Sequence, residues 1–212
     1  MQVLIPIIYP IIDGSIVTLD NIGKTAEAII DGGAKILQLR AKSLSSKKFL
    51  ETARIIRKIT KDKGTVFIVN DRVDIALLTD ADGVHLGQGD LPVKEARRLL
   101  GNNKIIGYST HNLREALEAV RLPVDYISFG PIFPTKTKED AQTPKGLKLL
   151  SEVRKAVVIP IVAIGGITET NMVHVLKEGV EGVAMISEIL TVKDISQKIN
   201  RVIATAKKIK RP

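Results

Sequence analysis

The stretch "IPIVAIGGITETNMVHVLKEGVEGVAMIS", from Ile159 to Ser187, contains two short β-branched runs separated by an amphipathic segment. The runs IPIVAIGG and EGVAMIS are apolar on both faces between their ends, which is typical of buried strands in a parallel sheet. The segment between them has apolar residues at helical spacing and ends at Gly179, and glycine commonly follows the last residue of a helix. The stretch therefore predicts a strand, a helix and a second strand parallel to the first.

The same alternation continues along the whole chain of 212 residues. Strand candidates lie at eight places, residues 3–11, 34–40, 65–70, 82–87, 104–109, 124–130, 159–166 and 181–187. Amphipathic segments lie between them, with Gly32, Gly33, Gly64 and Gly101 where helices should end and Pro92 where one should begin. Eight such units predict a single-domain (β/α)8 TIM barrel over residues 1–212. A doubly wound open sheet is the alternative, but it usually has fewer strands, and no G-x-G-x-x-G follows the first strand.

The composition restricts the chemistry and the partners. The chain has no cysteine, which excludes disulfides, thiolate metal sites and a cysteine nucleophile. Its net charge of +9 is spread over many segments and aromatic residues make up only 3%, so a small anionic substrate is favoured over a nucleic acid. The apolar N-terminus lacks a basic leader, and no apolar run is long enough to span a bilayer. We therefore expect a soluble, cytoplasmic protein without a membrane partner.

The C-terminal ends of the strands carry the active site in a barrel of this kind, so polar residues there are candidates by position. In the second strand, alternation places Gln38, Arg40 and Lys42 on one face and Leu37 and Leu39 on the other. The leucines are expected to face the helices, so the polar set faces the barrel mouth. Exposed loop cations are the alternative for the two basic residues, but not for the glutamine, which lies within the strand.

Carboxylates follow the third and fourth strands, which are neighbours in such a barrel. VNDR places Asn70 and Asp71 at the mouth, and DGVHLGQGDLP adds His85 and Asp90. An Asn-Asp pair often forms a turn or a helix cap, and the second aspartate could begin a helix. The functional alternative is that Asp71 and Asp90 bind a hard divalent cation together, and so few ligands suit Mg²⁺, which keeps waters and binds phosphate oxygens.

Three further strand ends carry hydroxyl groups or glycines. Ser109 ends the fifth strand and is either the N-cap of the next helix or part of the site. After the seventh and eighth strands, Gly165 and Gly166 are followed by Ile186 and Ser187, where barrels commonly bind phosphate on backbone N–H groups. An ordinary tight turn is the alternative, but it needs only the glycines and not their pairing with the next strand.

The segment FPTKTK follows the sixth strand, between the predicted metal site and the predicted phosphate site. Thr135 and Thr137 can donate hydroxyl hydrogen bonds to phosphate oxygens, and Lys138 can supply a full positive charge. Fixed cations beside a departing anion stabilise charge as it develops. We therefore interpret the segment as an anion-binding loop.

The chain resembles thiamine phosphate synthases along the whole predicted barrel. The resemblance is carried by motifs at successive strand ends: QLRAK, VNDR, DGVHLGQGDLP, IIGYSTH, DYISFGPIFPTKTK, PIVAIGGI and GVAMIS. It implies a transferase that joins an aminopyrimidine methyl diphosphate to hydroxyethylthiazole phosphate, giving thiamine phosphate and pyrophosphate. In that family the carbon–oxygen bond to diphosphate breaks first, and the thiazole nitrogen captures the pyrimidine methyl cation.

The resemblance also implies roles for the candidate residues. Contacts to the pyrimidine diphosphate would come from Gln38, Arg40, Lys42, Asn70, His85, Ser109 and Lys138. Of these, the catalytic residues would be Arg40, Ser109 and Lys138. Mg²⁺ would be bound by Asp71 and Asp90. Contacts to the thiazole phosphate would come from Thr135, Thr137, Gly165, Gly166, Ile186 and Ser187.

Three other functions are alternatives. The related thiazole tautomerase resembles the synthase in fold but lacks much of the diphosphate and metal set, whose members here are Lys42, Asn70, Asp71, Asp90 and Lys138. A sugar-phosphate isomerase would share the glycine phosphate site but needs a proton-transferring pair at the substrate carbon. The third alternative, a phosphate-binding module without turnover, is suggested by the net charge of +9. It would leave Asp71 and Asp90 without a role.

Overall fold

The computed structural model describes residues 4–135, 137 and 143–209. Its strands are β1 Ile8–Asp13, β2 Ile36–Arg40, β3 Val66–Asn70, β4 Gly83–Leu86, β5 Ile105–Thr110, β6 Tyr126–Phe129, β7 Ile161–Ala163 and β8 Gly182–Met185. Its helices are α1 Leu19–Asp31, α2 Ser46–Asp62, α3 Val73–Leu78, α4 Val93–Leu100, α5 Leu113–Ala119, α6 Gly146–Ala156, α7 Met172–Lys177, α8 Ser187–Leu190 and α9 Ile195–Ile209.

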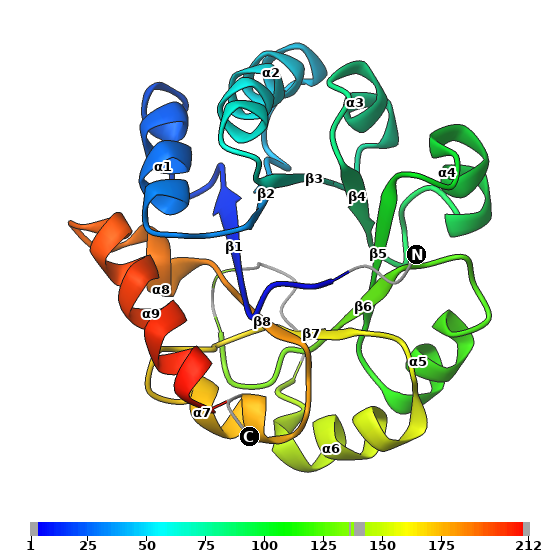
Figure 1. Cartoon of the computed structure of the whole chain (residues 1–212). Helices are drawn as coiled ribbons and strands as arrows, with labels where there is room; N and C mark the ends of the chain where they lie inside the picture. Colours follow the sequence, from blue (N-terminus) through cyan, green and yellow to red (C-terminus); the bar gives the residue numbers. More distant parts are fainter. Residues whose placement is uncertain (1–3, 136, 138–142, 210–212) are drawn as a thin grey trace.

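The strands form a closed parallel barrel in chain order, from β1 to β8 and back to β1. Figure 1 looks along this barrel and shows the helices as an outer ring around the strands. The predicted (β/α)8 barrel is therefore confirmed. Because all strands run in the same direction, their C-terminal ends meet at one mouth, where the candidate residues were expected.

Each strand differs from its predicted range at one or both ends, and the differences at β1 and β8 bear on the site. β1 is Ile8–Asp13 rather than residues 3–11, because its pairing with β8 begins at Ile8 and its pairing with β2 reaches Asp13. β8 ends at Met185, since the backbone of Ile186 leaves the extended conformation with φ −118° and ψ −89°. Ser187 consequently opens α8 instead of closing the strand.

The helix boundaries follow the predicted signals. Gly32 and Gly101 are the C-cap residues of α1 and α4, and Pro92 is the N-cap residue of α4. Positive φ angles occur at Gly33, Gly64 and Gly179, each just past a helix. These residues end the helices because glycine adopts the left-handed conformation without steric cost.

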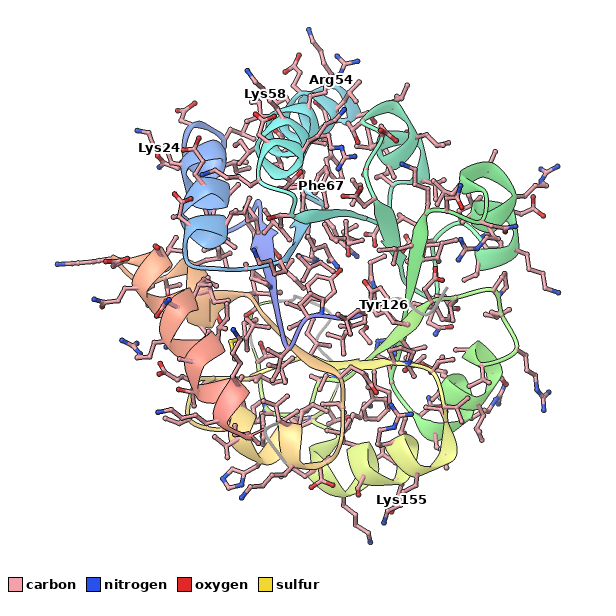
Figure 2. The ribbon with its side chains drawn as sticks, in the orientation of Figure 1. Lys24, Arg54, Lys58, Phe67, Tyr126 and Lys155 are labelled. Carbon is pink, nitrogen blue, oxygen red and sulfur yellow. The ribbon has the colours of Figure 1, made fainter. Side chains whose placement is uncertain are left out.

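The core lies on both sides of the strands. Every residue of β2, β4, β6 and β8 is buried, including the polar Gln38, Arg40 and His85. The outer faces of the helices are charged, and Figure 2 shows Lys24, Arg54, Lys58 and Lys155 projecting away from the barrel. Within the residues that the structure describes, no helix is both long enough and apolar enough to pass through a bilayer.

Three clamps of the same plan close the N-terminal face of the barrel. In each clamp, an arginine of α2, α4 or α6 forms an ion pair with the acidic residue directly before β4, β6 or β8. The same carboxylate accepts a hydrogen bond from a backbone N–H of β3, β5 or β7. The pairs are Arg57 with Asp82, Arg97 with Asp125 and Arg154 with Glu181, at 2.8, 2.6 and 3.0 Å. The N–H donors are those of Phe67, Ile106 and Ile161. This face therefore stabilises the barrel, while the opposite face is left for a site.

The C-terminal helix α9 holds the ends of β7 and β8 together. It packs against α1 and α7 in the outer ring (Figure 1). Lys198 of α9 is buried, and its Nζ donates to Glu188 of α8 at 2.5 Å and to Glu169, in the loop after β7, at 2.9 Å. The two loops that form the predicted phosphate site are thereby fixed to one helix.

Candidate active site

A cavity of about 940 Å³ opens at the C-terminal ends of the strands, and every strand contributes to its lining. Its lining includes the predicted residues Gln38, Arg40, Lys42, Asn70, Asp71, His85, Asp90, Ser109, Thr135, Thr137, Gly165, Gly166, Ile186 and Ser187. Lys138, which was also predicted, lies outside the described residues. Residues from both halves of the chain thus meet around one cavity.

An ion pair orients Arg40 at the wall of this cavity. Its Nη1 lies 2.5 Å from Oδ2 of Asp13, the last residue of β1, which is directly opposite Arg40 in the strand register. Asp13 is held in turn by the backbone N–H and the hydroxyl of Ser15, at 2.9 and 2.7 Å. Since a guanidinium has five N–H donors, this bond fixes the side chain and leaves donors for an anion. Asp13 was not singled out from the sequence, because a carboxylate at the end of an apolar strand resembles a turn residue.

Asp71 and Asp90 lie close to each other in the loops after β3 and β4, and both line the cavity. Burial, followed by the hydrogen bond and the charge of Asp90, raises the pKa of Asp71 to about 6. Lys42 opposes this rise in pKa, and its Nζ lies 3.5 Å from Oδ2 of Asp71. Two carboxylates in contact repel each other when both are ionised, so a single lysine leaves this pair short of positive charge.

The backbone fixes both aspartates in place. Asp71 has a φ of 63°, a strained value for a residue other than glycine, and its N–H donates to the carbonyl of His85 at 2.8 Å. Oδ2 of Asp90 accepts the backbone N–H of Gly87 at 2.6 Å. Asp90 does not begin a helix, because the N-cap residue of α4 is Pro92.

The donor set of these two aspartates fits Mg²⁺. A divalent cation between the carboxylates would remove the repulsion that raises the pKa of Asp71. Among the described residues, no cluster of three or more His, Cys, Asp or Glu side chains could hold a metal ion. A cation here would therefore take its other ligands from water and from phosphate oxygens, which is the coordination that Mg²⁺ prefers.

Ser109 belongs to strand β5 and does not cap the next helix. The N-cap residue of α5 is Asn112, whose Oδ1 accepts the N–H of Glu115 at 2.9 Å. Oγ of Ser109 lies 3.0 Å from Nε2 of His85, and Oγ of Ser128 lies 3.3 Å from the same nitrogen. Two hydroxyl groups therefore contact one edge of the imidazole at the cavity wall.

Two buried tyrosines that the sequence did not single out lie below His85. Oη of Tyr126 is 2.9 Å from Nδ1 of His85 and 2.8 Å from Oη of Tyr9. Figure 2 shows Tyr126 inside the ring of strands. Burial raises the pKa of both tyrosines well above the ordinary value, so both are neutral phenols.

The glycine pair after β7 makes room for the loop after β6. Gly165 and Gly166 have φ angles of 96° and 63°. A Cβ on Gly166 would lie 2.5 Å from the carbonyl oxygen of Pro134, and one on Gly165 would lie 2.4 Å from Cβ of Pro131. The N–H of Phe133 also donates to the carbonyl of Gly165 at 3.0 Å. Both positions therefore require glycine for two reasons, the positive φ angle and the lack of room for a Cβ. An ordinary tight turn would require only the first.

Hydroxyl groups gather beside these glycines. Oγ1 of Thr135 donates to Oγ1 of Thr137 at 3.2 Å, and Oγ1 of Thr137 donates to Oγ of Ser187 at 3.4 Å. Ser187 is the first residue of α8, so the loop after β6 reaches the end of β8. Hydroxyl and backbone N–H donors suit a phosphate monoester.

Comparisons with known proteins agree along the chain. The sequence profile of the family described as "Thiamine monophosphate synthase" matches residues 8–189. The chain is 48% identical over 194 residues to the thiamine-phosphate synthase of Persephonella marina, covering 92% of each chain. It is 51% identical over 170 residues to that of Chloroflexus aurantiacus, covering 80% of this chain and 78% of the relative.

A solved structure supports the same assignment. The thiamine phosphate pyrophosphorylase from Pyrococcus furiosus superposes with a TM-score of 0.86 at 34% identity, covering 97% of both chains. The matched profile extends from the first residue of β1 into α8, so it includes both sides of the cavity. Profile, relatives and fold agree on one assignment, and the chain belongs to the thiamine-phosphate synthase family.

Proposed function

We propose that this protein joins an aminopyrimidine methyl diphosphate to hydroxyethylthiazole phosphate, giving thiamine phosphate and pyrophosphate. The observation that carries the proposal is one cavity with two different anion-binding sides. Carboxylates and basic residues follow β2 to β4, whereas glycines and hydroxyl groups follow β6 to β8. The first side suits a diphosphate with a divalent cation, and the second suits a phosphate monoester.

The reaction begins with departure of the diphosphate. The bond between the methylene carbon and the diphosphate oxygen breaks, and its electron pair leaves with pyrophosphate. Arg40, oriented by Asp13, donates to the oxygens on which charge develops, together with Lys42 and Asn70. We assign Lys138 the same role from its position next to Thr137 in the sequence.

Asp71 and Asp90 would hold Mg²⁺ in this site. When bound, the ion would neutralise part of the charge of the departing pyrophosphate and so lower the cost of its release. The strained backbone of Asp71 and the N–H of Gly87 keep the two carboxylates at the mouth, ready for the ion. The two carboxylates repel each other in the metal-free protein, and binding of the ion would relieve this repulsion.

The thiazole substrate binds through its phosphate on the opposite side. Thr135, Thr137 and Ser187 donate to the phosphate oxygens, aided by the backbone N–H groups of Gly166 and Ile186. This contact aligns the thiazole nitrogen with the methylene carbon. The nitrogen lone pair forms the new carbon–nitrogen bond and leaves the positive charge on the thiazolium ring. No proton moves in that step, so the site needs no general base.

The alternatives predict other outcomes. A thiazole tautomerase would isomerise a thiazole and release no pyrophosphate, and it has no use for the pair Asp71 and Asp90. A phosphate-binding module would show no turnover. The relatives and the solved structure carry synthase or pyrophosphorylase names. We also infer a cytoplasmic location, because both substrates are charged phosphate esters that do not cross a bilayer unaided.

The test is a reaction of the purified protein with both substrates and Mg²⁺. Thiamine phosphate is identified by mass spectrometry, pyrophosphate is measured enzymatically, and EDTA serves as the control. We expect both products, and neither in EDTA. Absence of thiamine phosphate from a folded preparation would overturn the proposal, and an assay of thiazole isomerisation would then identify a tautomerase.

A further inference from the structure

A chain of hydrogen bonds crosses the floor of the cavity between two residues of the pyrimidine side. Nε2 of Gln38 donates to Oη of Tyr9 at 3.0 Å, and that oxygen lies 2.8 Å from Oη of Tyr126. Oη of Tyr126 lies 2.9 Å from Nδ1 of His85, whose Nε2 lies 3.0 Å from Oγ of Ser109. The chain therefore runs from β2 through β1, β6 and β4 to β5.

The first four members of this chain are almost completely excluded from water, and Ser109 at its end is half-buried. The exposed fraction is 3% for Gln38, 1% for Tyr9, 0% for Tyr126 and 8% for His85. A polar group that is buried without a partner is unfavourable, so the hydroxyl hydrogens within the chain must be used. Because burial raises the pKa of both tyrosines, each keeps its single hydroxyl hydrogen.

The number of hydrogens fixes the direction of the chain. Tyr9 accepts from Gln38, so its one hydroxyl hydrogen goes to Tyr126. Tyr126 then gives its own hydrogen to Nδ1 of His85. A neutral imidazole whose Nδ1 accepts carries its proton on Nε2, which lies 3.0 Å from Oγ of Ser109 and 3.3 Å from Oγ of Ser128. Oγ of Ser109 therefore accepts from Nε2, and it also accepts from Oγ of Ser128 at 3.4 Å. The hydroxyl hydrogen of Ser109 is thereby left for a ligand in the cavity that this residue lines.

The position of Gly107 independently supports the contact between His85 and Tyr126. It lies in β5, in register between His85 of β4 and Tyr126 of β6. A Cβ at this position would lie 2.1 Å from Cζ of Tyr126 and 2.4 Å from Nδ1 of His85. The two rings stack across the glycine with centroids 5.4 Å apart. Glycine weakens the interior of a strand, so its place here indicates that the close approach of the rings is required.

We propose that Tyr9 and Tyr126 are positioning residues for the pyrimidine substrate. Their hydroxyl groups hold the amide of Gln38 so that its Oε1 is the free acceptor, and they hold His85 in the tautomer that makes Ser109 a donor. An aminopyrimidine offers the complementary groups, namely amino hydrogens and ring nitrogens. The identity of this ligand rests on the proposed function, whereas the tautomer can be measured without any substrate.

The first test is nitrogen NMR of protein labelled at its histidines, at a pH above the range in which an ordinary imidazole titrates. The chain has three histidines, so glutamine substitutions of His111 and His174 assign the signals of His85. We expect the wild-type proton on Nε2, and a mixture of tautomers in Tyr126→Phe, because that variant lacks the hydroxyl group that donates to Nδ1 in the wild type. A wild-type proton on Nδ1, or the same tautomer in both proteins, would overturn the proposal.

Kinetics separate positioning from stability. Tyr126→Phe should raise the KM for the pyrimidine diphosphate about tenfold, equivalent to about 1.4 kcal/mol, and leave the KM for the thiazole phosphate unchanged. Tyr9→Phe should also raise the KM for the pyrimidine diphosphate. It tests the same role if Tyr126→Phe does not fold. Tyr108→Phe is the matched control, since its hydroxyl donates to Gln88 outside the chain, and it should change neither KM.

The outcomes distinguish the two proposals. A folded wild type that forms no thiamine phosphate would overturn the proposed function and leave the tautomer result standing. An active wild type whose KM for the pyrimidine diphosphate is the same in Tyr126→Phe and Tyr9→Phe would overturn the positioning role alone.

Discussion

The guanidinium of Arg40 lies 2.5 Å from the carboxylate of Asp13, and both residues are buried at the mouth of the barrel. The strand register pairs them directly, so the contact follows from the closure of β1 on β2. Removing one partner of a buried ion pair costs about 3–5 kcal/mol, because the other charge is left without compensation. Asp13 therefore acts with Arg40 as a unit.

Asp13→Asn should lower kcat about tenfold or more, since Arg40 loses the anchor that orients it. It should also lower Tm, by roughly 2–4 °C for each kcal/mol lost in a chain of this size. Steady-state kinetics and thermal unfolding measure the two effects. Asp20→Asn, at an exposed position in the first turn of α1, is the control. A lower Tm with unchanged kcat would make Asp13 a stability residue only.

Asp71 should destabilise the metal-free protein at neutral pH. Its pKa is raised from 3.8 to about 6, so the folded state binds more protons than the unfolded state between these values. The contribution of Asp71 to the free energy of unfolding is therefore most favourable below the lower value and is lost as the pH rises through about 6. Asp71→Asn should therefore raise Tm at neutral pH in EDTA, while abolishing Mg²⁺-dependent turnover.

Thermal unfolding of wild type and Asp71→Asn across this pH range, with EDTA or Mg²⁺, checks the expectation. Mg²⁺ should raise the Tm of the wild type at neutral pH and leave that of the variant unchanged. A variant that unfolds at a lower temperature than the wild type in EDTA at neutral pH would refute it.

Gly166→Ala should weaken binding of the thiazole phosphate. Gly64→Ala is a matched control, because the two glycines have φ angles of 63° and 62°. Each alanine should therefore cost about 1–2 kcal/mol of backbone strain. A Cβ at Gly166 would also collide with the carbonyl of Pro134 at 2.5 Å, whereas one at Gly64 would meet nothing within 4 Å. Only Gly166→Ala should raise the KM for the thiazole phosphate, and equal KM values for the two variants would contradict this.

Asp125→Ala should lower stability without changing either KM. It removes one of the clamps at the N-terminal face, leaving Arg97 without its carboxylate partner and the N–H of Ile106 without its acceptor. An unsatisfied buried group costs about 1–3 kcal/mol, which calorimetry would detect as a lower Tm. A change in the KM for either substrate would show that this face is coupled to the cavity.

The barrel could be predicted from the sequence because its signals are local. Apolar strands, amphipathic helices and glycine stops recur along the chain, and the closed structure follows from their number and order. The ends of a strand were less predictable where pairing with neighbouring strands determines them. The two ends of β1, Ile8 and Asp13, are set in this way by β8 and β2. Likewise, Ser187 continues an apolar run in the sequence, yet the turn of the backbone at Ile186 makes it a helix residue.

The candidate site could be predicted where a polar side chain follows a strand, as for Asp71 and Asp90. Tyr9 and Tyr126 could not be predicted in this way, because each lies inside an apolar strand and resembles a core residue. Their contact joins positions 117 residues apart, which only the closed barrel brings together. The one local signal was Gly107, a glycine in the middle of the strand IIGYST.

The amounts of thiamine phosphate and pyrophosphate formed in a single reaction, followed over time at several Mg²⁺ concentrations, test the proposed condensation most directly. We predict equal amounts of the two products at every time, at a rate that rises with Mg²⁺ to a plateau and vanishes in EDTA. Pyrophosphate without thiamine phosphate, or thiamine phosphate formed at an undiminished rate in EDTA, would contradict it.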